Sequence, residues 1–403
     1  MNTCIGEGQL KTLILKPILI DHNHMNRPVE IFLRFFRNQS NSGIAIFISV
    51  LIAMVWANSP WKEFYMDMVQ MDISISIGYF TLSEPFLIWV NDLLMAIFFL
   101  FVGLELKREI LGGKLSSFKK AMLPIGAAII GVLSLFGKRV PSGLKVFLIA
   151  LAIVDDLGAV LVIALFYTSE ISAMDLLHGL LFFIVLIGGS FASIRNPWFY
   201  ACIGIGGVWL AFFFSGIHPT TAGILTALAI PGRVKIKERD FLVKLQQLHQ
   251  RFLKIKPISG NFISDEQLDI LEEIKQKSDD AETPLQKLEH HLAPFVGFFI
   301  LPLFALVNTG IHLHGNLLET LTQPLSLGIF FGLLVGKFIG ILGGSWIMVK
   351  FNIAEFQAGL SWSMISAAAL LAAMGFTMSL FITELAFENE QYIFTAKISI
   401  LFT

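Results

Sequence analysis

Three ionisable side chains lie in the middle of long apolar runs, where they could hold or exchange an ion. Asp155 and Asp156 are adjacent and have eleven residues on each side within the apolar run 144–167. Lys337 has twelve residues on each side within the run 325–349. A charged side chain at the centre of a membrane helix costs roughly 2.5–3.5 kcal/mol on insertion scales. An ammonium and two carboxylates at one depth are therefore expected to neutralise each other.

Two adjacent carboxylates exceed what a structural ion pair requires. One lysine neutralises one carboxylate, and neighbouring side chains on a helix point about 100° apart. The second carboxylate needs a proton, a cation or water, and hard cations such as Na⁺ prefer oxygen ligands. A carboxylate that holds either a proton or a Na⁺ is the core of an ion exchanger. The alternative is a buried salt bridge that only fixes helix packing.

The elements that position these residues are membrane-spanning helices. The chain has 403 residues, of which 55% are hydrophobic and 15% charged, and this composition excludes an ordinary soluble domain. Apolar runs near the length of a spanning helix predict an all-α polytopic membrane protein with eleven segments. They are 43–60, 86–104, 121–136, 144–167, 176–194, 198–215, 219–231, 293–311, 325–349, 361–383 and 391–403.

Lysine and arginine predict the orientation of these segments, because short cytoplasmic loops carry the excess of positive charge. Basic residues gather before the first segment and after the second, whereas the loops 168–175, 312–324 and 384–390 contain no Lys or Arg. The pattern places the N-terminus in the cytoplasm and predicts a multi-pass protein.

The chain divides into four parts on this basis. Residues 1–42 form a cytoplasmic N-terminal extension, and 43–231 contain the first membrane helices. Residues 232–290 form a charged cytoplasmic loop with two short helices, and 291–403 contain the remaining membrane helices. The first membrane part is incomplete around 121–137, because its short segment is flanked by basic clusters on both ends. Either this segment enters the membrane and returns on the same side, or one crossing is missing. A missing crossing is favoured, because about 16 residues are too few for two crossings.

Several classes of function are excluded by composition and motifs. A net charge of −1 leaves no basic surface for nucleic acid. Gly336 and Lys337 do not fit the spacing of a phosphate-binding loop, so no nucleotide is expected. Cys4 and Cys202 belong to no cluster that resembles a zinc or redox motif. No cofactor is predicted.

Further site candidates come from polar or helix-breaking residues inside the segments. Asp92 lies about a third of the way into its segment, where it could line a water-filled funnel. Gly375, Phe376 and Thr377 interrupt the segment 361–383, and broken helices line the sites of many transporters. His218 lies at the outer membrane edge, as either a group that titrates near neutral pH or a hydrogen-bonded structural histidine.

Several of these motifs together resemble one family, the NhaA-type sodium/proton antiporters of bacterial inner membranes. The stretch ALAIVDDLGA at 150–159 is the most specific of them. The other matching stretches are 102–109, 166–168, 215–220, 288–290, 300–305, 332–337 and 375–379.

The resemblance implies an inverted-repeat transporter with discontinuous helices and twelve crossings. It makes Asp156 the carrier of Na⁺ and H⁺, with Asp155 beside it paired to Lys337, and it places Asp92 in the cytoplasmic funnel. It also makes Glu105, Glu109 and Glu289 candidates for a pH-sensing cluster, to which His218 is added. The implied activity is electrogenic, pH-activated exchange of cytoplasmic Na⁺ or Li⁺ for external H⁺. The expected partners are membrane lipid and a second copy in a homodimer.

Two departures from the family pattern keep other functions open. Between Lys120 and Lys138 the family has two crossings, the second with an unwound Thr-Asp pair, and here only 121–137 remain. The segment 391–403 is expected to be part of a twelfth crossing. The first alternative is therefore a transport-inactive remnant of the same family. A second is an intramembrane aspartyl protease, but adjacent acids on one helix diverge, whereas such a site needs two facing carboxylates.

Overall fold

The fold is a bundle of membrane-spanning helices. The computed structural model describes residues 41–78, 80–111, 158, 172–255, 263–313, 316–352, 360–372 and 375–403. Within these residues, five helices are long and apolar enough to cross a membrane, namely Phe86–Leu111, Ala173–Phe191, Pro197–Ser215, Pro284–Thr309 and Pro324–Lys350. The helices Ser42–Ala57 and Lys62–Gln70 form a sixth candidate that is bent by 117°. The predicted polytopic helical membrane fold is confirmed.

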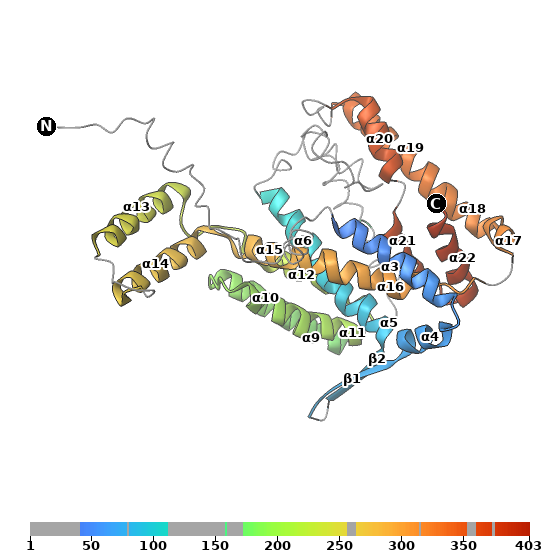
Figure 1. The fold of residues 1–403 in the computed structure, drawn as a ribbon, viewed down its shortest axis with the longest axis horizontal. Helices are drawn as coiled ribbons and strands as arrows, with labels where there is room; N and C mark the ends of the chain where they lie inside the picture. The colour runs from blue at the N-terminus through green and yellow to red at the C-terminus, as the bar shows by residue number, and fades with distance from the viewer. Residues whose placement is uncertain are drawn as a thin grey trace, which may run out of the picture.

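The first half of the described chain contains most of the bundle and its only described strands (Figure 1). Its elements are α3 (Ser42–Ala57), α4 (Lys62–Gln70), β1 (Asp72–Ile77), β2 (Phe80–Pro85), α5 (Phe86–Ile88), α6 (Met95–Leu111), α9 (Ala173–Phe191), α10 (Pro197–Ile203), α11 (Leu210–Ser215) and α12 (Thr221–Ala229).

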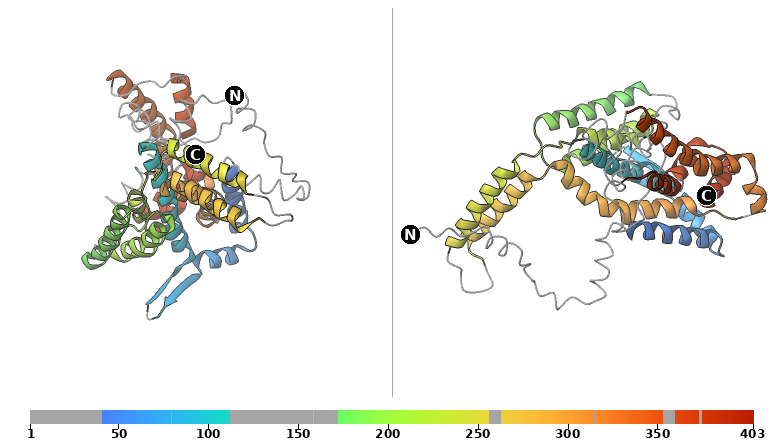
Figure 2. Two further views of the ribbon diagram at one scale, coloured as in Figure 1. Left: turned by 90° about the vertical axis from the view of Figure 1, so that its left-hand side faces the viewer. Right: turned by 90° about the horizontal axis from the view of Figure 1, so that it is seen from above.

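The second half begins with a helical hairpin that projects away from the bundle (Figure 2). Its elements are α13 (Glu238–Lys254), α14 (Asp265–Ala281), α15 (Pro284–Phe295), α16 (Leu301–Thr309), α17 (Leu317–Leu321), α18 (Pro324–Phe331), α19 (Lys337–Lys350), α20 (Trp362–Ala372), α21 (Phe376–Ala386) and α22 (Glu390–Leu401). Here α13 and α14 occupy the charged loop in which two helices were expected.

Within the part of the chain that the structure describes, four membrane helices contain a π-helical turn, and each turn joins two α-helical pieces into one span. The turns are Trp89–Leu94, Gly204–Trp209, Val296–Ile300 and Gly332–Gly336. Such turns occur often at functional sites, because they leave backbone carbonyls without their usual partners. Two of them coincide with sequence-predicted site residues, since Asp92 lies inside the first and Lys337 directly follows the last.

Residues 72–85 form an antiparallel hairpin for which the sequence analysis assigned no element. Its strands pair from Asp72 opposite Pro85 to Ile77 opposite Phe80. The alternation of isoleucine and serine along β1 is the period-two pattern of a strand, and it was a readable signal. The Trp89 indole N–H donates to the carbonyl of Ile73 at 3.0 Å, so the hairpin is attached to the start of the span that contains Asp92.

Helices α12 and α6 are in close contact through glycines. A Cβ atom at Gly223 would overlap the backbone carbonyl oxygen of Ala96 and lie 2.8 Å from the nitrogen of Leu100. A Cβ atom at Gly103 would lie 2.7 Å from the Ala227 side chain. Small residues allow helix backbones to approach closely in a membrane, where close packing replaces the hydrophobic effect as the driving force.

We expect Gly223→Ala to destabilise the bundle, because the new methyl group meets backbone atoms that no side-chain rotation can move. Overpacking of this kind costs about 1–3 kcal/mol. The measurement is the Tm of the purified protein in detergent, with the amount inserted in membranes. Gly206→Ala is the matched control, since a Cβ atom there meets nothing within 4 Å. Equal Tm values for the two variants would contradict the expectation.

Candidate ion site

Lys337 meets the break in the discontinuous helix. Helix α20 ends at Ala372 and α21 begins at Phe376, with Gly375 as its N-cap residue. A Cβ atom on Gly375 would lie only 2.6 Å from the Lys337 Nζ and 3.4 Å from the Ser379 hydroxyl. The structure therefore brings together two features that the sequence analysis selected separately, the membrane lysine and the glycine that interrupts 361–383.

The junction brings two positive groups close together. The N-terminus of a helix carries a partial positive charge, equivalent to about half an elementary charge. The first residues of α21 and the Lys337 ammonium are therefore two positive groups in contact. Asp155 and Asp156 lie outside the described residues, so their position relative to Lys337 is an expectation from the sequence. Phe376 and Thr377 are half-buried in the first turn of α21.

A second polar region is a cavity of about 360 Å³ that contains three ionisable side chains. Asp92, His218 and Glu384 line it together with Asn91 and apolar side chains. Asp92 lies in the π-helical turn before α6, and its backbone carbonyl accepts a hydrogen bond from the Trp209 indole at 3.2 Å. Three chain segments that are distant in sequence thus place their polar groups around one space.

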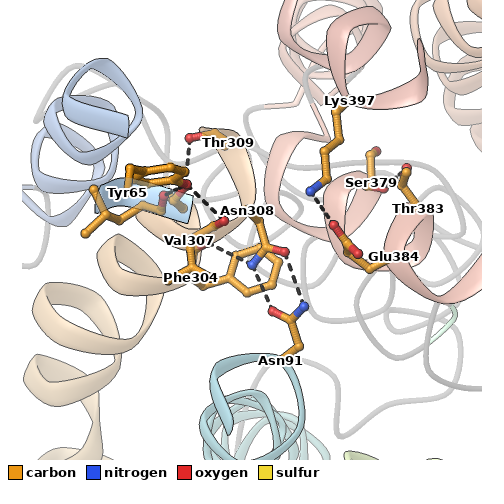
Figure 3. Close-up of polar contacts among 12 residues, drawn as sticks. Tyr65, Asn91, Phe304, Val307, Asn308, Thr309, Ser379, Thr383, Glu384 and Lys397 are labelled. Carbon is orange, nitrogen blue, oxygen red and sulfur yellow. Dashed lines mark hydrogen bonds and ion pairs between the residues drawn. The ribbon is translucent and has the colours of Figure 1, made fainter. Parts of the chain in front are cut away.

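Asn91 fastens one wall of this cavity by a reciprocal amide pair. The Asn308 amide donates to the Asn91 side-chain oxygen at 2.8 Å, and the Asn91 amide donates back at 3.2 Å (Figure 3). The Asn308 amide also donates to the carbonyl of Phe304 at 2.9 Å. Both amides are buried, and buried polar groups are tolerated when they are paired in this way. The pair connects the Asp92 turn to α16.

His218 lies in the turn between α11 and α12 and is buried. Its Nδ1 lies 2.8 Å from the Thr220 hydroxyl, and its ring packs edge-on against Phe381. Burial lowers the pKa of the imidazole to about 4, so the ring is neutral near pH 7. The hydrogen bond and the ring contact fit the structural histidine that the sequence left open, and a part for His218 in pH sensing stays a prediction.

The remaining acidic candidates gather around one arginine. Arg108 on α6 forms ion pairs with Glu289 on α15, with Glu109 at 3.3 Å and with Glu105 at 3.9 Å. Glu289 is 9% exposed, so its pairing with Arg108 compensates a buried charge. Three carboxylates around one guanidinium make a cluster whose net charge changes when a proton binds. The three acids were expected from the resemblance, whereas Arg108 as their shared partner was not.

Lys107 occupies the other side of the same helix end. Its Nζ donates to the carbonyls of Leu228 and Ile230 at 2.5 and 2.6 Å. These carbonyls belong to the C-terminal end of α12, where a positive charge interacts favourably with the helix dipole. The charged end of α6 is therefore fastened to both α15 and α12.

Asp92 and the Arg108 cluster lie at opposite ends of the span Phe86–Leu111. Thirteen residues separate Asp92 from Glu105, which corresponds to about 20 Å along a helix. Asp92 shares its cavity with His218 and lies far from Glu105 and Glu109 along the helix. The expectation that Asp92 lies in the cytoplasmic funnel stays a prediction.

The structure also contains an ion pair that sequence reasoning missed. Lys397 on α22 pairs with Glu384 on α21, and both side chains are 14% exposed (Figure 3). Lys397 lies inside the apolar run 391–403, and the rule that singled out Lys337 could have found it. Among the residues that the structure describes, no group of three His, Cys, Asp or Glu side chains could hold a metal ion.

Comparison with known proteins gives one consistent result. The family described as Na⁺/H⁺ antiporter 1 matches residues 33–133 and 129–403. A protein of Oleidesulfovibrio alaskensis named Na(+)/H(+) antiporter NhaA is 39% identical, with 92% of this chain and 90% of that protein covered. Proteins of the same name from Koribacter versatilis and Helicobacter pylori are each 40% identical, over 93% and 91% of this chain and 89% and 91% of their own lengths.

Proposed function

The chain belongs to the NhaA family of Na⁺/H⁺ antiporters, and from this premise we propose that it exchanges cytoplasmic Na⁺ for external H⁺. Members of this family are transporters and not enzymes, so the aspartyl protease alternative is set aside. The observation that supports the proposal most directly is the contact between Lys337 and the start of α21. This junction concentrates positive charge at a helix break, where a carboxylate pair from 155–156 would complete an ion site.

The proposed mechanism is competition for these two carboxylates. With a proton on Asp156 and Asp155 paired to Lys337, the site holds no Na⁺. At alkaline cytoplasmic pH Asp156 loses its proton, and Na⁺ binds to the carboxylate oxygens and displaces the pairing with Lys337. One repeat then moves against the other, Na⁺ leaves on the outer side, and protons reload the acids. We further propose that more H⁺ enters than Na⁺ leaves, and that Li⁺ substitutes for Na⁺.

The cavity around Asp92 is a polar path by which ions would reach the site in the outward-facing state. It lies on the side of α21 that ends at Ala386, beyond the Lys337 junction. A carboxylate in a water-filled space attracts cations and can pass protons. We propose this path for Asp92 as an alternative to the cytoplasmic funnel that the resemblance implied.

We propose that the Arg108 cluster sets the pH at which exchange begins. Arg108→Gln removes the guanidinium that forms ion pairs with Glu105, Glu109 and Glu289. A positive charge beside a group of carboxylates opposes the binding of protons to them. The pH profile of exchange is then expected to move toward alkaline pH by about one unit, which corresponds to about 1.4 kcal/mol of lost interaction. The measurement is Na⁺-dependent proton release across pH 6.5 to 8.5. Arg251→Gln is the control, since Arg251 pairs with Glu273 on the exposed helical hairpin. An unchanged profile for Arg108→Gln would contradict this role.

The setting of this activity is proposed from the resemblance and the charge pattern. We place the protein in the bacterial inner membrane with its N-terminus in the cytoplasm, in contact with lipid and as a homodimer. Large apolar side chains of α9 and α19 are exposed, Phe191 by 86% and Ile339 by 61%, and such surfaces are suited to lipid.

A second candidate is a family member that does not transport. The family match divides at residues 129–133, within the segment where one crossing is expected to be missing. In addition, the alignment to the Oleidesulfovibrio protein is 405 positions long but covers only 92% of this chain, so it contains gaps in this chain. Loss of a crossing beside the broken helix would leave the positive end of α21 without its neighbour.

The experiment that separates the two is Na⁺-induced proton release from everted membrane vesicles, followed with a dye that reports the pH gradient. Recovery of dye fluorescence on addition of Na⁺ or Li⁺ would support exchange by this chain. Absence of recovery, from protein shown to be inserted in the membrane, would favour the non-transporting alternative. Vesicles from the same host without the protein supply the background.

A further inference from the structure

The last helix, α22, contacts both elements that meet at Lys337. Lys397 pairs with Glu384 on α21, and the first residues of α21 lie beside Lys337. Ser399 lies with its hydroxyl 2.8 Å from the hydroxyl of Ser326 on α18, the helix that continues into α19 and Lys337. Both serines are 1% exposed. One helix therefore holds the broken helix and the lysine helix in a fixed relation.

These contacts lie at similar distances from the junction. Glu384 is nine residues beyond Gly375, or about 13 Å along α21, and Ser326 is eleven residues before Lys337, or about 16 Å along its helix. The two helices run in opposite directions between the junction and α22. The three helices thus form a closed frame in which α22 sets how far α21 reaches toward Lys337.

The ion pair is the strongest contact of this frame. Both of its side chains are 14% exposed, and removing one partner from such a pair leaves an uncompensated charge in a medium of low dielectric. Glu384 also lines the cavity that contains Asp92. Glu384 pairs with Lys397, whereas Asp92 forms no ion pair with another described residue. The Ser326 and Ser399 contact is neutral and weaker.

We propose that Glu384 and Lys397 are positioning residues for ion exchange: through this pair, α22 holds α21 at the depth where its first turn meets Lys337. The role rests on the proposed Na⁺/H⁺ exchange. Neither side chain needs to touch the ion. A displacement of α21 along its axis would change the distance between Gly375 and the lysine ammonium, and displacements near 1 Å can lower a rate by about 100-fold.

The test compares Glu384→Gln, Lys397→Gln and the reversed pair Glu384→Lys with Lys397→Glu in everted vesicles. Each single variant is expected to raise the KM for Na⁺ and to lower the rate per inserted protein. The ratio of rate to KM should fall by about 10-fold. The reversed pair is expected to regain most of both. Glu388→Gln, four residues further along the chain at an exposed position, is the matched control and should match the unaltered protein.

A merely structural role gives a different pattern. It would lower the amount of inserted protein and leave the KM of the remainder unchanged, and that result would overturn the proposal. Equal activity of the single variants and the reversed pair would overturn the pairing.

The Tm of the purified protein in detergent is a second measurement, and it does not depend on transport. The single variants should lower the Tm and the reversed pair should restore it. If the unaltered protein shows no exchange, the proposed function fails and the α22 contact is judged on melting alone. Unchanged Tm in both single variants would then overturn it.

Discussion

Asp156→Asn is expected to reduce Na⁺-dependent proton release to the background of vesicles without the protein. Asparagine retains the size of the side chain and one oxygen ligand, but it carries no charge and cannot release or take up a proton near neutral pH. Competition between H⁺ and Na⁺ for the side chain is then lost. The measurement is fluorescence recovery on addition of Na⁺ and Li⁺ across pH 6.5 to 8.5.

The control for Asp156→Asn is the same change at Asp175, at the start of α9. Asp175 accepts a hydrogen bond from the Ser172 hydroxyl at 2.6 Å, and no part in ion exchange is assigned to it. Asp175→Asn should retain exchange. Exchange retained in well-inserted Asp156→Asn would refute the mechanism, whereas loss with normal insertion supports it.

Gly375→Ala is expected to lower exchange by on the order of 10- to 100-fold while the protein remains folded. The added methyl group would lie 2.6 Å from the Lys337 Nζ. This atom is the end of a flexible side chain, so the clash is relieved by moving the ammonium and not by moving a backbone. The stability effect should be small, and the effect on the position of the charge should be large.

Two measurements distinguish these effects of Gly375→Ala. The Tm in detergent reports the fold, and the rate per inserted protein reports the site. Gly343→Ala is the matched control on α19, because a Cβ atom there meets nothing within 4 Å. A loss of Tm equal to the loss expected for Gly223→Ala would show that the backbone had moved instead of the lysine. Normal exchange by Gly375→Ala would refute the functional contact.

The two glycine predictions differ for a reason that only the structure provides. Gly223 and Gly375 are both buried glycines in apolar segments of the sequence. At Gly223 the neighbouring atoms are backbone atoms of α6, and at Gly375 the neighbour is a lysine side chain. The first position therefore controls helix packing and the second controls a charge.

Much of the fold could be predicted because the bilayer imposes a local rule. An apolar run near 20 residues crosses the membrane as a helix wherever it occurs, so six of the expected segments correspond to Ser42–Ala57 and to the five long spans. The break at Gly375 was also readable, because glycine has a poor helix propensity. Segment 121–136 and, apart from Gly158, segment 144–167 lie outside the described residues, so both remain predictions.

Pairing between distant residues could not be predicted in this way. Arg108 and Glu289 are separated by 181 positions, and their contact depends on how α6 and α15 cross. The shared cavity of Asp92, His218 and Glu384 likewise depends on the depth at which three helices end. Neither crossing nor relative depth is a periodic property of a sequence.

The amino-acid sequence was sufficient to predict that this protein lies in a membrane, roughly where its spans lie, and which charged residues require partners. Hydropathy and charge along the chain are sufficient for this, because the cost of placing polar groups in the hydrocarbon core applies to each segment separately. Only the folded structure shows which residues meet: Lys397 pairs with Glu384, Arg108 pairs with three acids, and Lys337 lies beside the glycine that begins α21. Those contacts follow from close packing of helices through small residues, which brings side chains from distant parts of the chain together.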